Sequence, residues 1–246
     1  MTALLIAAAV LAAATPSGRR ANAGPALAVP TAAVATAPPV LPPSGVIANY
    51  EVALAGLQEP RVFTVEYAVQ QTGTRALDQT HRIFRSGSDE RDETLAVNGT
   101  RSKYPVVRIF RRRPYRYTVA AMAPKPSAYS FTYLGPRRNG KHVDYVFTLV
   151  PKHAVPLAFT RVTIDGVTFL PQTVAFATKQ HAGTGSVTFA KAERYWVART
   201  ASAQAELAGG VAREQIAFSK WRFPKALPRS TFAMPRPLPT LRPALP

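Results

Sequence analysis

Four histidines are the side chains best suited to catalysis in this chain, and they are scattered at His81, His142, His153 and His181. His142 and Asp144 stand two residues apart and would share one face of a strand. Without a nucleophile or a third partner, such a pair is typical of a surface hydrogen bond. No HExxH, GxSxG, Walker or dinucleotide-binding fingerprint occurs. We therefore expect a protein that is not an enzyme.

The chain is also poor in metal ligands. Cysteine is absent, which excludes disulfides, cysteine-rich zinc sites, iron–sulfur clusters and thiol nucleophiles. The carboxylates between Asp89 and Glu93 lack the glycine and the spacing of a calcium-binding loop. The sequence predicts no metal and no cofactor.

The chain carries a large net positive charge. Lys and Arg number 31 against 13 Asp and Glu, for a net charge of +18, which favours anionic partners. We expect an anionic head-group site at a dense arginine cluster: Arg108, Arg111, Arg112, Arg113 and Arg116. Two alternatives stay open for this cluster: a solvated strand face balanced by the nearby carboxylates, and a nucleic-acid surface with tyrosines as stacking platforms. No nucleic acid is expected, because a secreted protein seldom meets it.

Strands are predicted to position most of these residues. The stretch from Ala158 to Lys191 holds apolar runs separated by Asp165-Gly166 and by Gly183-Thr184-Gly185, a pattern typical of hairpins. Asp165-Gly166 predicts a tight two-residue turn, and beyond it Val174 and Phe176 alternate with small residues, as on a half-buried strand. Further strands are expected over 61–71, 79–85, 128–134, 142–150, 193–200 and 211–223, and over 103–119 with an interruption at Pro114.

One segment has helical periodicity instead. Ile47, Tyr50, Leu54 and Leu57 recur at three- and four-residue steps, which predicts a helix over 44–59 with Ser44 as its cap and Pro60 as its end. One helix followed by ten or so strands predicts a mainly β fold: a strongly curved antiparallel sheet, an open or half β-barrel, with the N-terminal helix packed on it.

The two ends of the chain differ from this domain. An apolar run from Ala3 to Ala14 resembles a signal-peptide core, with Ala21-Asn22-Ala23 as a cleavage motif, although no Lys or Arg precedes the run. We expect a signal peptide over 1–23, a Pro/Ala-rich linker over 24–44, the β domain over 45–234 and a Pro-rich tail over 235–246. Cleavage near Ala23 would make the protein periplasmic or secreted.

The order of these blocks resembles a known family. The helix, the opening strand ending in EYAVQQTG, then YVFTLVPK, FTRVTIDGVTFLPQTVAFAT and finally IAFSKWRFPKALPRSTFAMP are similar to the bacterial lipoprotein-carrier (LolA-like) family. The resemblance implies a secreted half-barrel that binds acyl chains of lipids or lipidated proteins. It covers roughly residues 44–234.

Acyl-chain binding needs apolar side chains rather than polar site chemistry. A buried methylene contributes about 0.8 kcal/mol, so roughly a dozen would supply on the order of 10 kcal/mol before entropic costs. We expect the following large side chains to line a groove in part, with an ordinary core as the alternative: Phe63, Tyr67, Phe147, Phe159, Phe169, Phe176, Phe189, Phe218 and Trp221.

The sequence thus predicts a non-enzymatic lipid- or lipoprotein-binding carrier of the cell envelope, with an anionic membrane surface as a further partner. One alternative is an envelope interaction module that binds anionic polymers or lipid head groups through its basic surface. The tail offers another, because Arg236-Pro237-Leu238-Pro239 resembles a polyproline ligand.

Overall fold

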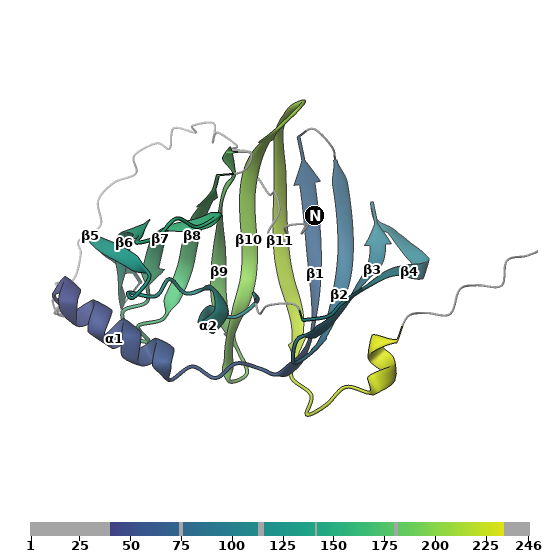
Figure 1. Ribbon diagram of the computed structural model, residues 1–246, viewed down its shortest axis with the longest axis horizontal. Helices are drawn as coiled ribbons and strands as arrows, with labels where there is room; N and C mark the ends of the chain where they lie inside the picture. The colour runs from purple at the N-terminus through teal and green to yellow at the C-terminus, as the bar shows by residue number, and fades with distance from the viewer. Residues whose placement is uncertain (1–39, 74–75, 113–115, 141, 180–181, 234–246) are drawn as a thin grey trace, which may run out of the picture.

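The computed structural model describes residues 40–73, 76–112, 116–140, 142–179 and 182–233. These residues form one antiparallel sheet of eleven strands in the order β4-β3-β2-β1-β11-β10-β9-β8-β7-β6-β5 (Figure 1). The two edge strands, β4 and β5, do not pair with each other, so the sheet is open. The predicted mainly β fold with a curved open sheet and one N-terminal helix is confirmed.

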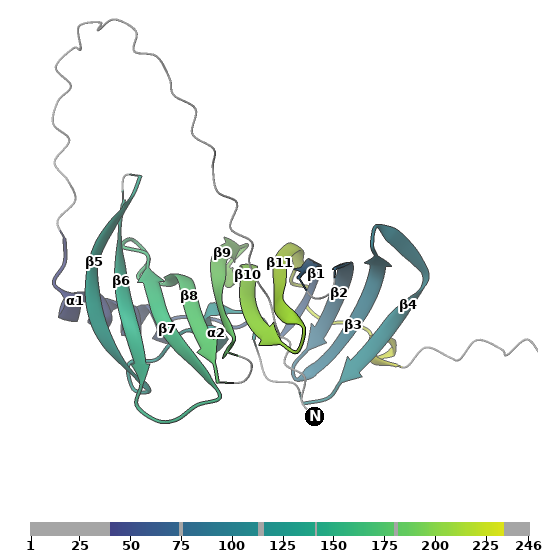
Figure 2. The same ribbon diagram turned by 90° about the horizontal axis from the view of Figure 1, so that it is seen from above.

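Strands that follow each other in sequence pair, except β4 and β5, and β1 pairs with β11 at the middle of the sheet. The first and last strands therefore lie side by side, with the two edges far apart (Figure 2). The strands are β1 Val62–Thr72, β2 Leu77–Ser86, β3 Asp89–Val97, β4 Thr100–Phe110, β5 Tyr129–Asn139, β6 His142–Pro151, β7 Leu157–Ile164, β8 Pro171–Thr178, β9 Thr184–Ala192, β10 Tyr195–Leu207 and β11 Gly210–Arg222.

Alternation along the strands gives the sheet one buried face, here called the inner face. On β1 the buried residues are Phe63, Val65 and Tyr67, and on β8 Val174 and Phe176 are buried as their spacing predicts. Successive side chains of a strand point to opposite faces, so these residues share the face that packs on the rest of the molecule.

Two helices lie on the inner face. Helix α1, Pro43–Ala55, buries Val46 and Tyr50 against the β5–β10 half of the sheet, and the Tyr50 hydroxyl donates to the Pro124 carbonyl oxygen at 2.8 Å. It begins at Pro43 with Pro42 as N-cap and no side-chain cap, so the prediction of a Ser44 cap is wrong. Proline suits the first turn, since the N–H it lacks there has no helical partner.

The second helix, α2 over Val119–Met122, is a single turn that the sequence did not predict. The Thr118 side chain accepts a hydrogen bond from the Ala121 amide, and Thr118 forms a β-bridge with Val197 of β10. This segment crosses the inner face near the middle of the sheet (Figure 1).

The connection between β7 and β8 differs from the predicted two-residue turn. Ile164 pairs directly with Pro171, so the residues from Asp165 to Leu170 form the loop. One Asp165 carboxylate oxygen accepts hydrogen bonds from the Val167 and Thr168 amides and from the Thr168 hydroxyl. Asp165 therefore organises a wider loop with its side chain, and the tight Asp-Gly turn does not form.

Strand β3 is a second departure, because the strands expected from the sequence do not include its charged residues. Glu90, Asp92 and Thr94 of β3 are buried on the inner face. On the opposite face Arg91 donates to the carbonyl oxygens of Thr231 and Ala233, at 3.0 and 3.1 Å. These bonds hold the 3-10 turn η2, Arg229–Phe232, beside β3.

Candidate functional site

The nine predicted groove residues divide between two clusters on the inner face. The first cluster buries Phe147, Phe176 and Phe189 under α1 and α2, with Phe159 and Phe169 partly buried against it. The second buries Phe63 and Tyr67, with Trp221 partly buried beside them. Phe218 packs against both clusters. The structure therefore brings these residues onto one face but not into one cavity.

A groove lies between α1 and the edge of the sheet at β5 and β6. It has a volume of about 440 Å³ and is here called the helix groove; its lining residues are Pro43, Ser44, Ile47, Ala48, Glu51, Pro126, Tyr129, Phe131, Tyr133 and Phe147. Of the predicted groove residues, Phe147 alone lines it. The volume falls within the range of roughly 300–1,000 Å³ that is usual for small-molecule sites.

Aromatic rings make up the sheet side of the helix groove. Phe147 lies 5.9 Å from Phe131 and 5.2 Å from Tyr133, measured between ring centroids. Tyr129, Phe131 and Tyr133 alternate along β5, and this period of two is a sequence signal that identifies one face of the strand. The sequence could not show that α1 lies across this face, so these residues were missed.

One residue that lines the helix groove, Tyr133, has a buried polar atom without a partner in the described part of the chain. The Tyr133 hydroxyl oxygen is buried and forms no hydrogen bond with the described residues. Burial, with a smaller contribution from Tyr145, raises the pKa of Tyr133 above its usual value, so the hydroxyl keeps its proton. A buried hydroxyl without a partner is costly.

Beside the second apolar cluster, the inner face carries buried polar groups on β2 and β3. Arg85 of β2 and Glu90 of β3 form an ion pair of 2.9 Å with both side chains fully buried, and the Tyr117 hydroxyl donates to Glu90. Beside them, Asp92 contacts the His81 ring nitrogen Nδ1 and accepts from the Tyr67 hydroxyl, each at 3.1 Å. Tyr67 and His81 stack with ring centroids 4.6 Å apart.

Glu214 lies between the two halves. It pairs with Ala203 across β10 and β11, and Ala203 is buried on the inner face, so the Glu214 side chain lies on that face too. Burial raises the pKa of Glu214 from 4.5 to about 8, so this carboxyl is mostly neutral at pH 7. A neutral carboxylic acid is compatible with an apolar ligand on the same face.

We expect Glu214→Gln to raise the melting temperature at pH 8 and to change it little at pH 4. In the wild type the unfolded chain releases the proton near pH 4.5 and the folded chain near pH 8, so stability is lost as the pH rises through this interval. The glutamine variant lacks this loss. Thermal unfolding measured from pH 4 to pH 9 checks it, and parallel curves for the two proteins would contradict the assignment.

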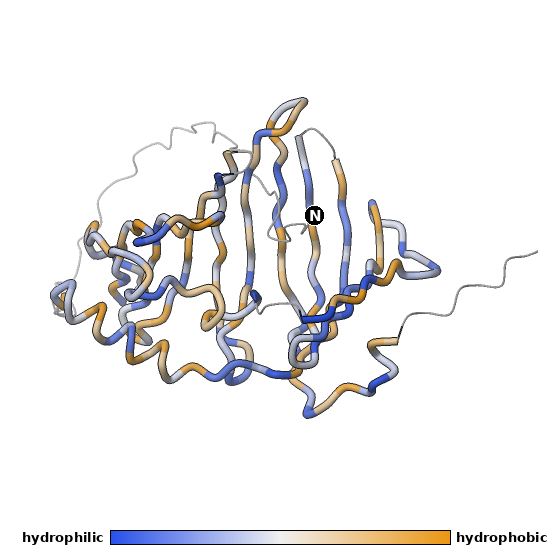
Figure 3. Tube along the Cα trace, in the orientation of Figure 1, coloured by the Kyte–Doolittle hydropathy of each residue, from blue (hydrophilic) through white to orange (hydrophobic). Residues whose placement is uncertain are grey.

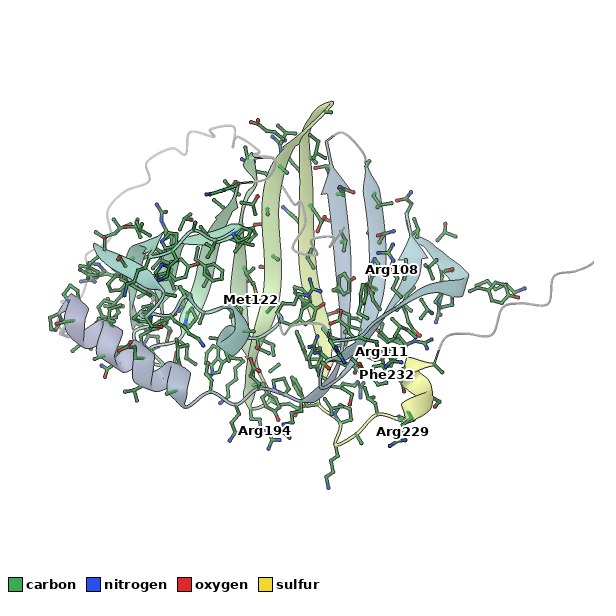
Figure 4. All side chains as sticks on the ribbon, viewed as in Figure 1. Arg108, Arg111, Met122, Arg194, Arg229 and Phe232 are labelled. Carbon is green, nitrogen blue, oxygen red and sulfur yellow. The ribbon has the colours of Figure 1, made fainter. Side chains whose placement is uncertain are left out.

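The predicted arginine cluster is spread over several environments. Arg108 and Arg112 are exposed, and Arg116 stacks over the Tyr117 ring at 6.0 Å from the centroid. Arg111 pairs with Asp89 and donates to the Phe232 carbonyl oxygen, which ties the end of β4 to η2 (Figure 4). Arg113 lies outside the described residues. Part of the cluster thus has a structural role, and the head-group site stays a prediction.

Within the described residues, no group of three or more His, Asp or Glu side chains is arranged to hold a metal ion. None of the helices in the same residues is long and apolar enough to cross a membrane. The predicted signal peptide, most of the linker and the Pro-rich tail lie outside the described residues.

No protein-family model matches the sequence, and a search of curated proteins finds no match. Among solved structures, a LolA superfamily protein from Nitrosomonas europaea is 11% identical with a TM-score of 0.44, over 79% of this chain and 99% of that one. A putative outer membrane lipoprotein-sorting protein domain from Vibrio parahaemolyticus is 14% identical with a TM-score of 0.45, over 76% and 95%. A DUF1329 family protein from Desulfovibrio piger is 12% identical with a TM-score of 0.43, over 76% and 97%.

Proposed function

We propose that this protein is a non-enzymatic lipid- or lipoprotein-binding carrier of the cell envelope, periplasmic or secreted, and that the helix groove receives an acyl chain. The helix groove carries the proposal: it is lined by α1 on one side and by the aromatic rings of β5 and β6 on the other. Burial of methylenes there supplies binding energy without any polar chemistry.

The amphipathic character of a lipid fits the composition of the helix groove. Ile47, Phe131 and Phe147 offer apolar contact, whereas Ser44, which also lines the groove and is exposed, offers a hydroxyl group. An acyl chain that ends in an ester or a carboxylate has both parts. A purely polar ligand would leave the aromatic wall without a partner.

The difference between the two halves of the inner face favours the half under α1 as the site of the acyl chain. The β2–β3 half is occupied by the buried Arg85–Glu90 and His81–Asp92 pairs. Hydrocarbon placed against buried charges gains little, because these groups need polar partners. The apolar cluster beneath α1 has no comparable cost.

Two measurements test the proposal on the full chain. Extraction of the purified protein with organic solvent, followed by mass spectrometry, is expected to yield co-purified lipid. The delipidated protein is then expected to bind a fluorescent fatty acid with saturable, micromolar affinity. If the extract contains no lipid and the delipidated protein does not bind the fatty acid, the carrier function is wrong.

A further inference from the structure

A second pocket lies at the lower rim of the sheet, away from the helix groove. It has a volume of about 690 Å³ and is here called the rim pocket; its lining residues are Gln58, Glu59, Arg61, Val62, Arg194, Tyr195, Phe223, Pro224 and Lys225. None of them lines the helix groove. Figure 4 places Arg194 at this rim, below the middle strands.

The strand topology brings these residues together from three parts of the chain. Arg61 precedes β1, Lys225 follows β11, and Arg194 lies in the turn between β9 and β10. Because β10, β11 and β1 are successive antiparallel neighbours, the start of β10, the end of β11 and the start of β1 meet at one end of the sheet. The connecting segments at this end include hydrophilic stretches (Figure 3).

The charged residues of the rim pocket are three cations and one carboxylate. The side chains of Arg61, Arg194 and Lys225 are exposed, and none of them forms an ion pair within the described part of the chain. The carboxylate, Glu59, already accepts a hydrogen bond from the Thr118 hydroxyl at 3.2 Å. The pocket therefore keeps an excess of positive charge.

The rim pocket also has a rigid aromatic wall. Tyr195 is 8% exposed, and its ring centroid lies 4.6 Å from that of Phe223. The Arg194 guanidinium lies over the Tyr195 ring, 5.0 Å from its centroid. This contact occupies no hydrogen-bond acceptor, so the guanidinium N–H groups stay available to an oxyanion.

From this geometry we propose that the rim pocket binds a phosphate group, with Arg61, Arg194 and Lys225 as its ligands. Arginine pairs with phosphate through two parallel N–H···O bonds, and lysine adds a point charge. The phosphate belongs either to a lipid head group or to a soluble phosphate chain. This site does not depend on acyl-chain binding in the helix groove, so each can fail without the other.

Two probes distinguish a lipid head group from a soluble phosphate chain as the source of the phosphate. Inorganic tripolyphosphate, titrated by calorimetry, reports a soluble phosphate ligand. Sedimentation with phosphatidylcholine vesicles, with and without phosphatidylglycerol, reports a head group. Trp221 stacks on Phe223 with ring centroids 6.0 Å apart, so occupation of the pocket is also expected to change the tryptophan emission.

The decisive comparison uses two double variants that lose the same charge. Arg61→Gln/Arg194→Gln is expected to weaken binding of the responding probe about tenfold or more, because two charge-assisted contacts are lost. Arg161→Gln/Arg229→Gln, at exposed positions outside both the rim pocket and the predicted arginine cluster, is expected to bind like the wild type. Equal loss in both variants, loss in the second alone, or no binding of either probe would overturn the proposal.

Discussion

Replacing Arg85 by methionine is expected to lower the free energy of unfolding by about 3–5 kcal/mol, because it removes the Arg85 guanidinium from the buried Glu90 carboxylate. Both side chains of this ion pair are 0% exposed, and they face each other across β2 and β3. The Arg85 Nε–H group also donates to the Gly87 carbonyl oxygen at 3.0 Å, a bond that methionine cannot replace. Denaturant unfolding of the purified variant measures the loss.

The double variant Arg85→Met/Glu90→Leu is expected to recover most of that stability. An apolar pair of similar size removes both desolvation costs, whereas a single change removes only the attraction. Arg82→Met on the same strand is a matched control, because its guanidinium pairs with Glu66 at a partly exposed site with 41% of the arginine side chain accessible. Exposed pairs contribute roughly 0–1 kcal/mol. A double variant as unstable as Arg85→Met would show that the loss does not come from breaking the Arg85–Glu90 pair.

The burial of this ion pair could not be predicted from the sequence. Strands with apolar alternation, such as β1 and β8, were found because every second residue is apolar and therefore points inward. On β3 the inward residues are Glu90, Asp92 and Thr94, which the same pattern assigns to solvent. Their partners Tyr67, His81 and Arg85 come from two other strands, so nothing local to β3 indicates that the charges are buried.

Only part of the candidate site could be predicted, because the pattern within one segment does not show which other segment packs against it. The helix was expected from its three- and four-residue spacing, and Phe147 from the alternation of β6. The helix groove, however, requires α1 to lie beside β5, some 80 residues later in the chain. The positions of Ile47 and Phe131 in one groove are a property of the tertiary structure. Likewise Asp165-Gly166 is a strong local signal, and the hydrogen bonds of the Asp165 side chain outweighed it.

Filling the helix groove is expected to abolish most acyl-chain binding. Ala48 lines it from the exposed side of α1, so the indole of Ala48→Trp would occupy space that the ligand needs. Excluding about two methylenes costs roughly 1.6 kcal/mol, and 1.4 kcal/mol is a factor of ten. We therefore expect the dissociation constant of a fluorescent fatty acid to rise at least about tenfold, as measured by direct titration.

Val52→Trp is the matched control, because Val52 is 73% exposed on the same helix and does not line the groove. It adds the same ring to α1, so any general effect of the indole on the helix or on nonspecific adsorption appears in both variants. Ala48→Ser, which barely changes the volume, is expected to bind like the wild type. If Ala48→Trp folds with an unchanged melting temperature and still binds at wild-type strength, the acyl chain lies elsewhere on the inner face. Phe176 and Phe189 would then be the next residues to change, because they lie deeper in the same apolar cluster.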